Sequence, residues 1–442
     1  MERVTNRSFQ PVIILRYGVF ALLALLPFHS VLVLPGVSVV RVFGLILVPI
    51  WIIWALGRLI IKRLPIKFSK ASITIMTLTL GLFLSIIISQ FYAPPSPFFI
   101  SSAITVLSGI VMTVIISTVI NSERDLWKAC IALAIGGVVA SLMVITEFAA
   151  PELIPDFLHQ QTIHLSESVV RARGFFRDPN YGAMLLIVIF CITFYITLAT
   201  RALRWRFFMY GAVTLQAAAV VLTFSRASYI TLSLVILLIL WRERHGNRFW
   251  KANITIGMIV IVFVALGGIL MEAVLSRAGT VFDFIRFLKG DPTGARQPDL
   301  SLWYRLYVAL GGIQMAVDHF PFGVGWENFI FYISEYAAVP PHAPHNTYIA
   351  VAAELGLLGL FVLAFLASIL WKSTSRICKI THGTFNLLAN GIKYGLLTIL
   401  FEGLFLTVLN EALVWALIGL IMALNQVAFN TFQEKARSII KK

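Results

Sequence analysis

Charged residues are scarce in this sequence, and their scarcity excludes an ordinary soluble protein. Asp, Glu, Lys and Arg make up only 12% of the 442 residues, whereas soluble domains carry about 25%. Most of the surface must therefore be apolar, in agreement with a hydrophobic content of 59%. The apolar runs are about 20 residues long, the length of helix that crosses a hydrocarbon core of ~30 Å. The chain is predicted to be an integral membrane protein.

Other features that the sequence lacks exclude further kinds of fold and site. Strand patterns that alternate over ~10 residues are missing, which argues against a membrane β-barrel. Because backbone groups in lipid must be satisfied within the segment, helices remain. Cys130, Cys191 and Cys378 all lie in or near apolar segments, and the sequence has no CxxC or Cys/His metal spacing. Neither a disulfide framework nor a zinc site is therefore predicted. No internal repeat and no low-complexity linker divides the chain.

The sequence predicts an all-α polytopic fold with about twelve membrane-spanning helices. The predicted spans are 15–34, 37–58, 71–92, 98–120, 127–149, 181–200, 207–224, 227–241, 252–271, 346–371, 386–408 and 411–430. Segment 207–241 is divided into a hairpin at Ser225, Arg226 and Ser228, because a single span cannot hold ~35 residues.

Basic residues indicate how the chain lies in the membrane. The formal net charge of +15 would point to nucleic acid in a soluble protein. Here most basic residues lie in short loops between spans, where they report orientation. With these spans every basic cluster falls on one side, at 58–70, 124–128, 201–206, 242–251, 372–379 and 435–442. Both termini are therefore predicted to be cytoplasmic, with no nucleic-acid partner. The basic N-terminus lacks a small-residue cleavage site, so the first span is predicted to be retained.

On this topology the chain falls into four parts. They are the first five spans (1–150), spans six to nine with an external loop at 151–180 (151–271), a large external loop (272–345), and the last three spans with a cytoplasmic tail (346–442). Within the large loop, 281–289 is predicted as a helix on the membrane surface, 291–299 as a turn-rich loop and 301–319 as a helix.

Several arginines lie on the outer side, against the orientation bias, and each needs a reason. Arg171, Arg173 and Arg177 precede the sixth span, Arg226 sits at the tip of a short hairpin, and Arg305 lies on the predicted loop helix. Arg226 most needs an explanation, because inserting a charged residue within a span costs a free energy of roughly 2.5–3.5 kcal/mol, and less near the interface. The alternative for each arginine, that its side chain extends to lipid headgroups, stays open.

Two histidines lie at the outer mouth of the tenth span, in the segment PPHAPHNTY at 340–348. Histidine accepts and releases protons near neutrality, so His342 or His345 is a candidate general base. A metal site is disfavoured, because prolines interrupt a helix through both histidines and no acidic residue is adjacent in sequence. His345 can instead be a helix-start residue, with Asn346 or Thr347 as the cap.

Arginines together with a neutral-pH base favour a phosphate-bearing substrate. The guanidinium fork pairs with phosphate oxygens through two parallel bonds, and it stabilises the charge of a departing diphosphate. No Asp-x-Asp-like pair occurs on the outer side, so no metal and no cofactor are predicted. Glu402 lies inside the eleventh span and is a functional candidate by default. Its pairing with a buried cation such as Lys393 is the structural alternative.

Four sequence elements are distinctive: RARGFFRDPNYGAMLL (171–186), TFSRASYI (223–230), YRLYVALGGIQMAVDHFPFGVGWENF (304–329) and PHNTYIAVAAELGLLGL (344–360). Together they resemble the O-antigen ligase and O-antigen polymerase superfamily of bacterial membrane glycosyltransferases. Their order, their spacing and the long outer loop carry the resemblance, whereas the first five spans match only in hydropathy.

The resemblance implies a GT-C-like membrane fold in the bacterial cytoplasmic membrane. It also implies transfer of a glycan from undecaprenyl diphosphate to an acceptor, with inversion at the anomeric carbon and without a metal. By motif, Arg226, Arg305 and His345 fall on the family's functional arginines and histidine, and Arg173 joins the two arginines in holding the diphosphate. Secondary candidates are His342, Asn346, Asn180 and Glu402.

Members of the family are distinguished by the acceptor to which they transfer the glycan. Lipid A core as acceptor makes an O-antigen ligase, the leading prediction. A growing repeat-unit chain makes an O-antigen, capsular or exopolysaccharide polymerase, and related members act on protein. A transporter of polysaccharide or lipid without chemistry is the alternative of another class. It is disfavoured because no inverted repeat is visible and because ionisable residues are few inside the membrane. A structural partner with a degenerate site is the third hypothesis.

Overall fold

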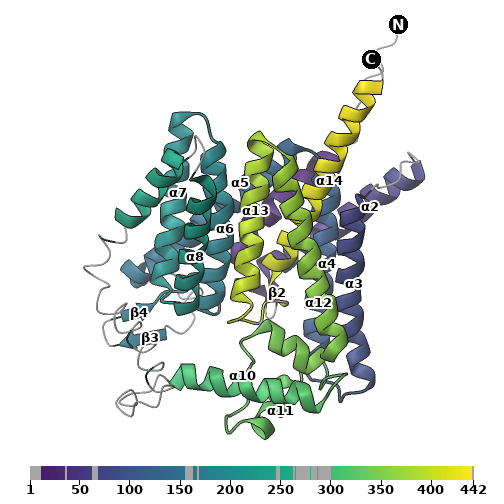
Figure 1. Ribbon diagram of the computed structural model, residues 1–442, viewed down its shortest axis with the longest axis vertical. Helices are drawn as coiled ribbons and strands as arrows, with labels where there is room; N and C mark the ends of the chain where they lie inside the picture. The colour runs from purple at the N-terminus through teal and green to yellow at the C-terminus, as the bar shows by residue number, and fades with distance from the viewer. Residues whose placement is uncertain are drawn as a thin grey trace.

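The chain folds into a bundle of long helices with a smaller helical layer at one end (Figure 1). The computed structural model describes residues 11–34, 37–61, 68–154, 163–166, 169–244, 249–261 and 300–440, with single residues at 264, 279 and 286. The predicted surface helix at 281–289 and the predicted loop at 291–299 lie outside the described residues, apart from position 286.

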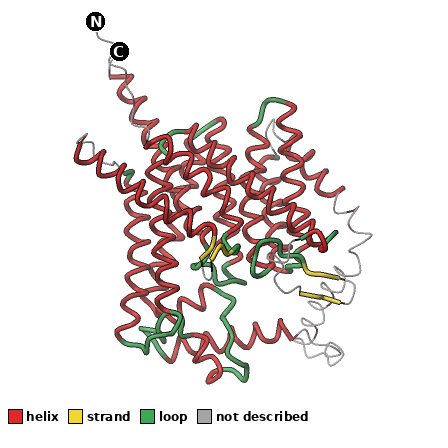
Figure 2. The backbone as a smooth tube through the Cα atoms, turned by 180° about the vertical axis from the view of Figure 1, so that it is seen from behind, coloured by secondary structure: helices red, strands yellow, loops and turns green. Residues whose placement is uncertain are grey.

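The described helices are numbered along the chain. They are α1 (Pro11–Leu25), α2 (Val39–Leu56), α3 (Lys70–Ile88), α4 (Phe99–Val119), α5 (Glu123–Ala149), α6 (Pro179–Ala199), α7 (Leu203–Leu222), α8 (Arg226–Glu243), α10 (Leu300–Asp318), α11 (Phe329–Tyr336), α12 (Thr347–Ile380), α13 (Gly383–Glu402) and α14 (Ala412–Ile440). Two short antiparallel hairpins, drawn as yellow tubes in Figure 2, pair β1 (Leu32–Leu34) with β2 (Val37–Ser38) and β3 (Ile163–Ser166) with β4 (Val169–Arg171).

The prediction of a polytopic helical membrane protein is confirmed. Eight helices in the described part of the chain are long and apolar enough to cross a membrane, and Ile13–Phe28 and Phe249–Ile261 are shorter apolar helices. The helices α8 and α13, which carry more polar side chains, coincide with two further predicted spans. The predicted span 252–271 is described as continuous helix only to Ile261.

The hairpin predicted around Arg226 is also present. Helix α7 ends at Leu222 and α8 begins at Arg226, so only three residues turn the chain. The turn is tight enough to hold Phe224 at a φ of 52°, a left-handed conformation that is uncommon outside glycine. Arg226 is therefore the first helical residue after a sharp turn, at the end of two packed helices.

Helix α6 is enclosed by its neighbours, and its side chains are buried almost throughout. It packs against α13 and α7, while α14 packs against α4 (Figure 1). Lipid supplies no hydrophobic force between helices, so close approach through small residues matters. A Cβ at Gly136 would meet the carbonyl of Ala24, and a Cβ at Gly109 would meet the Trp415 ring. These glycines let α1 and α14 approach their neighbours.

Helices α10 and α11 form the layer at the end of the bundle opposite the C-terminal end of α14 (Figure 1). The helix predicted at 301–319 is confirmed as α10. Val308 and Met315 of α10 share a small apolar core with Phe329 and Ile333 of α11 and with Ala353 of α12. Helix α12 bends within this layer, because Gly356 leaves helical geometry with a φ of 60°.

Candidate functional site

The segment that carries His345 is fixed by a helix cap. Asn346 precedes α12, and its Oδ1 accepts hydrogen bonds from the backbone N–H groups of Tyr348 (2.9 Å) and Ile349 (3.0 Å). Of the two residues predicted as the cap, Asn346 or Thr347, the structure shows that Asn346 is the cap. His345 lies just outside the helix with a φ of 45°, a conformation that costs on the order of 1–3 kcal/mol for a non-glycine residue. The fold thus holds the histidine in a strained geometry at the mouth of α12.

The loop after α13 locks this mouth in place. The Thr347 N–H donates to the carbonyl of Gly403 (2.8 Å), and the Thr347 hydroxyl accepts from the N–H of Val408 (3.0 Å). Because Gly403 follows the last residue of α13, these bonds bring His345 to the end of the helix that carries Glu402. His345 and Glu402 are 57 positions apart in sequence. The hydrogen bonds of Thr347 bring the segments that carry them together.

Glu402 is fully buried and is held by α8. Its Oε1 accepts a hydrogen bond from the Thr231 hydroxyl (2.7 Å), and the Ser228 hydroxyl is a second hydrogen-bonding neighbour. Its Oε2 is buried and has no hydrogen-bond partner among the described residues. Since Ser228 and Thr231 lie in the first turns of α8, Glu402 sits beside the helix end that begins with Arg226.

The alternative pairing of Glu402 with Lys393 is wrong. The two residues lie nine positions apart on the same helix, a separation of ~14 Å at 1.5 Å per residue. The Lys393 ammonium lies instead over the Trp371 ring, 4.5 Å from its centroid.

Arg305, on α10, links the histidine to this carboxylate electrostatically. Its positive charge acts on both His345 and Glu402. The pKa of His345 is lowered to about 4, first because the imidazole is buried and then because Arg305 and His342 repel a second positive charge. Asp178 acts in the opposite direction. The imidazole of His345 is therefore neutral at pH 7, with a ring centroid 5.0 Å from that of His342.

The segment before α6 is tied to the turn that precedes Arg226. The Nε of Arg171 donates to the carbonyl of Thr223 (2.7 Å), and its Nη2 donates to Oδ1 of Asn180 (2.6 Å). The backbone N–H of Ala172 also donates to Leu222 (3.3 Å). Arg171 and Asn180 thus connect the start of α6 to the end of α7.

Arg173 lies in the same segment, but its side chain is buried and its neighbours differ from those of Arg171. Its backbone N–H donates to the carboxylate of Glu147 (2.8 Å), and its Nη1 contacts the carbonyl of Arg177 (3.5 Å). Burial lowers the pKa of the guanidinium, and the charges of Glu147 and Asp178 act against that shift. Its Nη2 is buried and has no partner among the described residues. The negative charge of Asp178 thus acts on both Arg173 and His345.

The structure therefore brings the predicted candidates to one end of the bundle. Half-buried Arg226 and Arg305 come from α8 and α10, His345 from the mouth of α12, and buried Glu402 from the end of α13. Arg173 reaches the same end from the loop before α6. Both Arg226 and Arg305 also make interactions within the protein.

Sequence reasoning missed Asp178, the N-cap residue of α6. The histidines have no adjacent acid in sequence, yet the fold brings the charge of Asp178 within range of His345. The signal was present in the element RGFFRDPN, where Asp178 follows Arg173 by five positions. Its closeness to a residue 167 positions later does not follow from that spacing.

In the part of the chain that the structure describes, no group of three or more His, Cys, Asp or Glu side chains is placed to hold a metal ion. The chemistry of the cluster rests on what its own side chains offer. Guanidinium groups bind and stabilise anionic oxygens, and a neutral imidazole accepts a proton.

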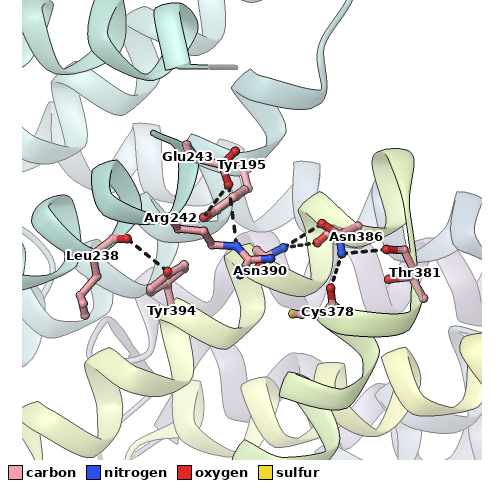
Figure 3. Close-up of polar contacts among 9 residues, drawn as sticks. All are labelled: Tyr195, Leu238, Arg242, Glu243, Cys378, Thr381, Asn386, Asn390 and Tyr394. Atoms are coloured by element: carbon pink, nitrogen blue, oxygen red, sulfur yellow. Dashed lines mark hydrogen bonds and ion pairs between the residues drawn. The ribbon is translucent and has the colours of Figure 1, made fainter. Parts of the chain in front are cut away.

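Figure 3 shows a second polar cluster, formed by residues of α6, α8, α12 and α13 and the residue after α12. Tyr195 donates to Oε1 of Glu243 (3.4 Å), Arg242 and Glu243 form an ion pair (3.8 Å), and Tyr394 contacts the carbonyl of Leu238 (3.4 Å). Arg242 follows Arg226 by sixteen residues, or ~24 Å along α8. This cluster joins the ends of α6, α8 and α13 and is separate from the candidate site.

An apolar cavity of about 580 Å³ lies between α10 and α12. Its lining includes Gly312 and Ala316 from α10 and Tyr348, Ala352 and Leu360 from α12. Of its lining residues, Tyr348 lies nearest in sequence to His345, three positions after it.

Residues 211–364 match the family model described as O-antigen ligase, and this range includes Arg226, Arg305 and His345. No curated protein matches the chain.

Proposed function

We propose that this membrane protein transfers a glycan from undecaprenyl diphosphate to an acceptor, because residues 211–364 match the family model described as O-antigen ligase. The reaction takes place at the outer face of the cytoplasmic membrane, and the proposed acceptor is lipid A core. The observation that carries the proposal is the shared electrostatic environment of Arg305, His345 and Glu402 at one end of the bundle.

The arginines bind the diphosphate of the donor. Arg226 and Arg305 each offer a planar fork that pairs with phosphate oxygens, and Arg173 contributes positive charge from the neighbouring loop. The same groups stabilise the negative charge that grows on the diphosphate as it leaves. The apolar cavity between α10 and α12, whose lining includes Tyr348 three positions after His345, accommodates the first isoprene units of the donor.

His345 accepts the proton of the acceptor hydroxyl. As the acceptor oxygen bonds to the anomeric carbon, its proton moves to the neutral imidazole, and the carbon–oxygen bond to the diphosphate breaks with its electron pair. Attack opposite the leaving group inverts the anomeric centre. Undecaprenyl diphosphate is released, and the proton on His345 passes to water.

Donor binding also sets the basicity of His345. Arg305 lowers the pKa of His345 in the free protein, and a bound diphosphate offsets that positive charge. The imidazole pKa therefore rises toward neutrality once the donor is present, and the base becomes stronger in the complex than in the free enzyme.

Purified protein tests the assignment directly. In a transfer assay with lipid-linked glycan and acceptor, Arg226→Ala should lower kcat by ~10²–10³, the range for loss of a charge-stabilising donor. His345→Ala should lower it by ~10²–10⁴, the range for a lost general base. Arg177→Ala is the matched control, since Arg177 is an exposed arginine in the adjacent outer loop. Unchanged rates in both site variants would overturn the proposal.

The acceptor is identified from the substrates that accumulate when the protein is removed. In a deletion strain, long glycan chains on undecaprenyl diphosphate indicate a lost ligase, whereas single repeat units indicate a lost polymerase. A transporter predicts neither product: purified protein would release no undecaprenyl diphosphate in detergent when acceptor is added.

A further inference from the structure

A large groove lies between α1, α5 and α7, at the end of the bundle remote from the candidate site. Its volume is about 1440 Å³, above the range of ~300–1,000 Å³ in which small molecules usually bind. The lining residues that matter are Tyr17 of α1, Lys128 and Val139 of α5, and Phe208 and Gly211 of α7. Arg201 and Thr200, from the loop between α6 and α7, also line it.

The groove has the depth of one membrane leaflet. Along α5 its lining runs from Trp127 to Val139, twelve residues or ~18 Å of helix. Half of a hydrocarbon core is about 15 Å. The groove therefore starts at one surface of the membrane and ends near its middle, as expected for a site that follows an acyl chain.

Positive charge is confined to the surface end of the groove. Lys128 and Arg201 line that end, and the rest of the lining is apolar or aromatic apart from Thr200 and Thr384. Lys128 lies over the Tyr17 ring, 5.8 Å from its centroid. The nearest acid on α5 that is buried, Asp125, already pairs with Arg16 (3.7 Å). Glu123 is exposed and does not line the groove.

The apolar wall is open to lipid and has room for a chain. Phe207 and Phe208 are 61% and 68% exposed, and Ile135 on the facing helix is 56% exposed. Gly211 contributes no side chain, and a Cβ at this position would meet nothing within 4 Å. The free space thus lies between two apolar helix faces, directly below the basic end.

We propose that this groove binds one anionic phospholipid of the leaflet opposite the candidate site. The phosphodiester pairs with Lys128 and Arg201, and an acyl chain runs along Phe208 and past Gly211. Basic pockets between membrane helices on the cytoplasmic side are suited to anionic headgroups. The site is independent of glycan transfer, because none of its residues belongs to the cluster around His345.

Lipid binding to the purified full chain tests the proposal by native mass spectrometry. With phosphatidylglycerol and phosphatidylcholine offered at equal concentration, the wild-type protein should retain phosphatidylglycerol with a preference on the order of tenfold. The double variant Lys128→Ala/Arg201→Ala should lose that preference. The control Lys372→Ala/Arg376→Ala removes two exposed basic residues from the same predicted side and should keep it.

A second pair of variants tests the chain-binding part. Gly211→Leu fills the groove and should abolish one retained lipid, while Gly44→Leu should not; a Cβ at Gly44 also meets nothing within 4 Å, but Gly44 lies on α2 outside the groove. Thermal unfolding supplies a second measurement, because a bound ligand stabilises the folded state. Phosphatidylglycerol should raise the melting temperature of the wild type and of Gly44→Leu but not of Gly211→Leu. Equal retention of both lipids by the wild type, or identical behaviour of the two leucine variants, would show ordinary boundary lipid and overturn the site.

Discussion

At the scale of single residues, His345 combines a strained backbone with a depressed basicity. Its φ of 45° and its pKa of about 4 both follow from where the fold holds it. A histidine in this state is ready to accept a proton at neutral pH, but it is a weak base until an anion arrives beside Arg305. The free enzyme and the donor complex should therefore titrate differently.

This difference predicts two pH–rate profiles. The profile of kcat/KM reports the free enzyme and that of kcat the complex. For a base, activity is lost as the pH falls through its pKa. The acid limb of kcat/KM should thus lie near pH 4, and the acid limb of kcat at higher pH. Coincident limbs near the ordinary histidine value of about 6.5 would contradict the proposed link between donor binding and basicity.

Arg305 is the residue through which that link acts. Arg305→Ala removes a positive neighbour, so the pKa of His345 should rise, although only part of the way because burial is the larger cause. The acid limb of kcat/KM should move to higher pH while the rate itself drops. Arg305→Lys keeps the charge and should leave the limb in place, with a lower rate because the two-bond fork is lost.

At the scale of elements, the start of α12 sets the position of the histidine. Asn346→Ala removes the cap of that helix, which should destabilise the protein by about 0.5–2 kcal/mol. The rate should also fall, since His345 is the adjoining residue. Asn346→Asp keeps the accepting oxygen but loses the donor to the carbonyl of Leu404 (3.0 Å), so it should be intermediate in both. Thermal unfolding and transfer rates measured on the same preparations check this order.

The bend in α12 is the second element on which the site depends. Gly356 has a positive φ, and a Cβ there would meet the carbonyl of Pro321. Gly356→Ala should therefore lower the melting temperature markedly, whereas Gly44→Ala, in a regular helix with open space, should change it little. If both substitutions had equal effects, the bend would not be under steric constraint.

Elements were easier to predict from sequence than the contacts between them. Apolar runs are local, so the spans and the turn before Arg226 follow from the sequence directly. Arg226, Arg305 and His345 were found by motif. The contact of Glu402 with Thr231 joins positions 171 apart and has no local signature. The bend at Gly356 and both strand hairpins were also missed, because tertiary contacts decide them.

At the scale of the whole molecule, the orientation in the membrane is a prediction from the basic loops. It is testable in right-side-out membrane vesicles with a membrane-impermeant maleimide. Arg177→Cys should react, since it lies on the predicted outer side, and Lys372→Cys should not. The native cysteines are all buried and give little background. If instead Lys372→Cys reacted and Arg177→Cys did not, the topology would be the opposite of the predicted one, and the candidate site would face the cytoplasm.

The hydrogen bond between Thr231 and Glu402 has a consequence for biogenesis. Its partners come from α8 and from the last residue of α13, so they are translated far apart in time. While the chain is being inserted, the arginine of α8 is in place long before Glu402 and the loop that clamps His345. A nascent chain thus has no assembled site until almost all of its helices have entered the membrane. Under the proposed function, transfer activity would therefore begin only after α13 has been inserted.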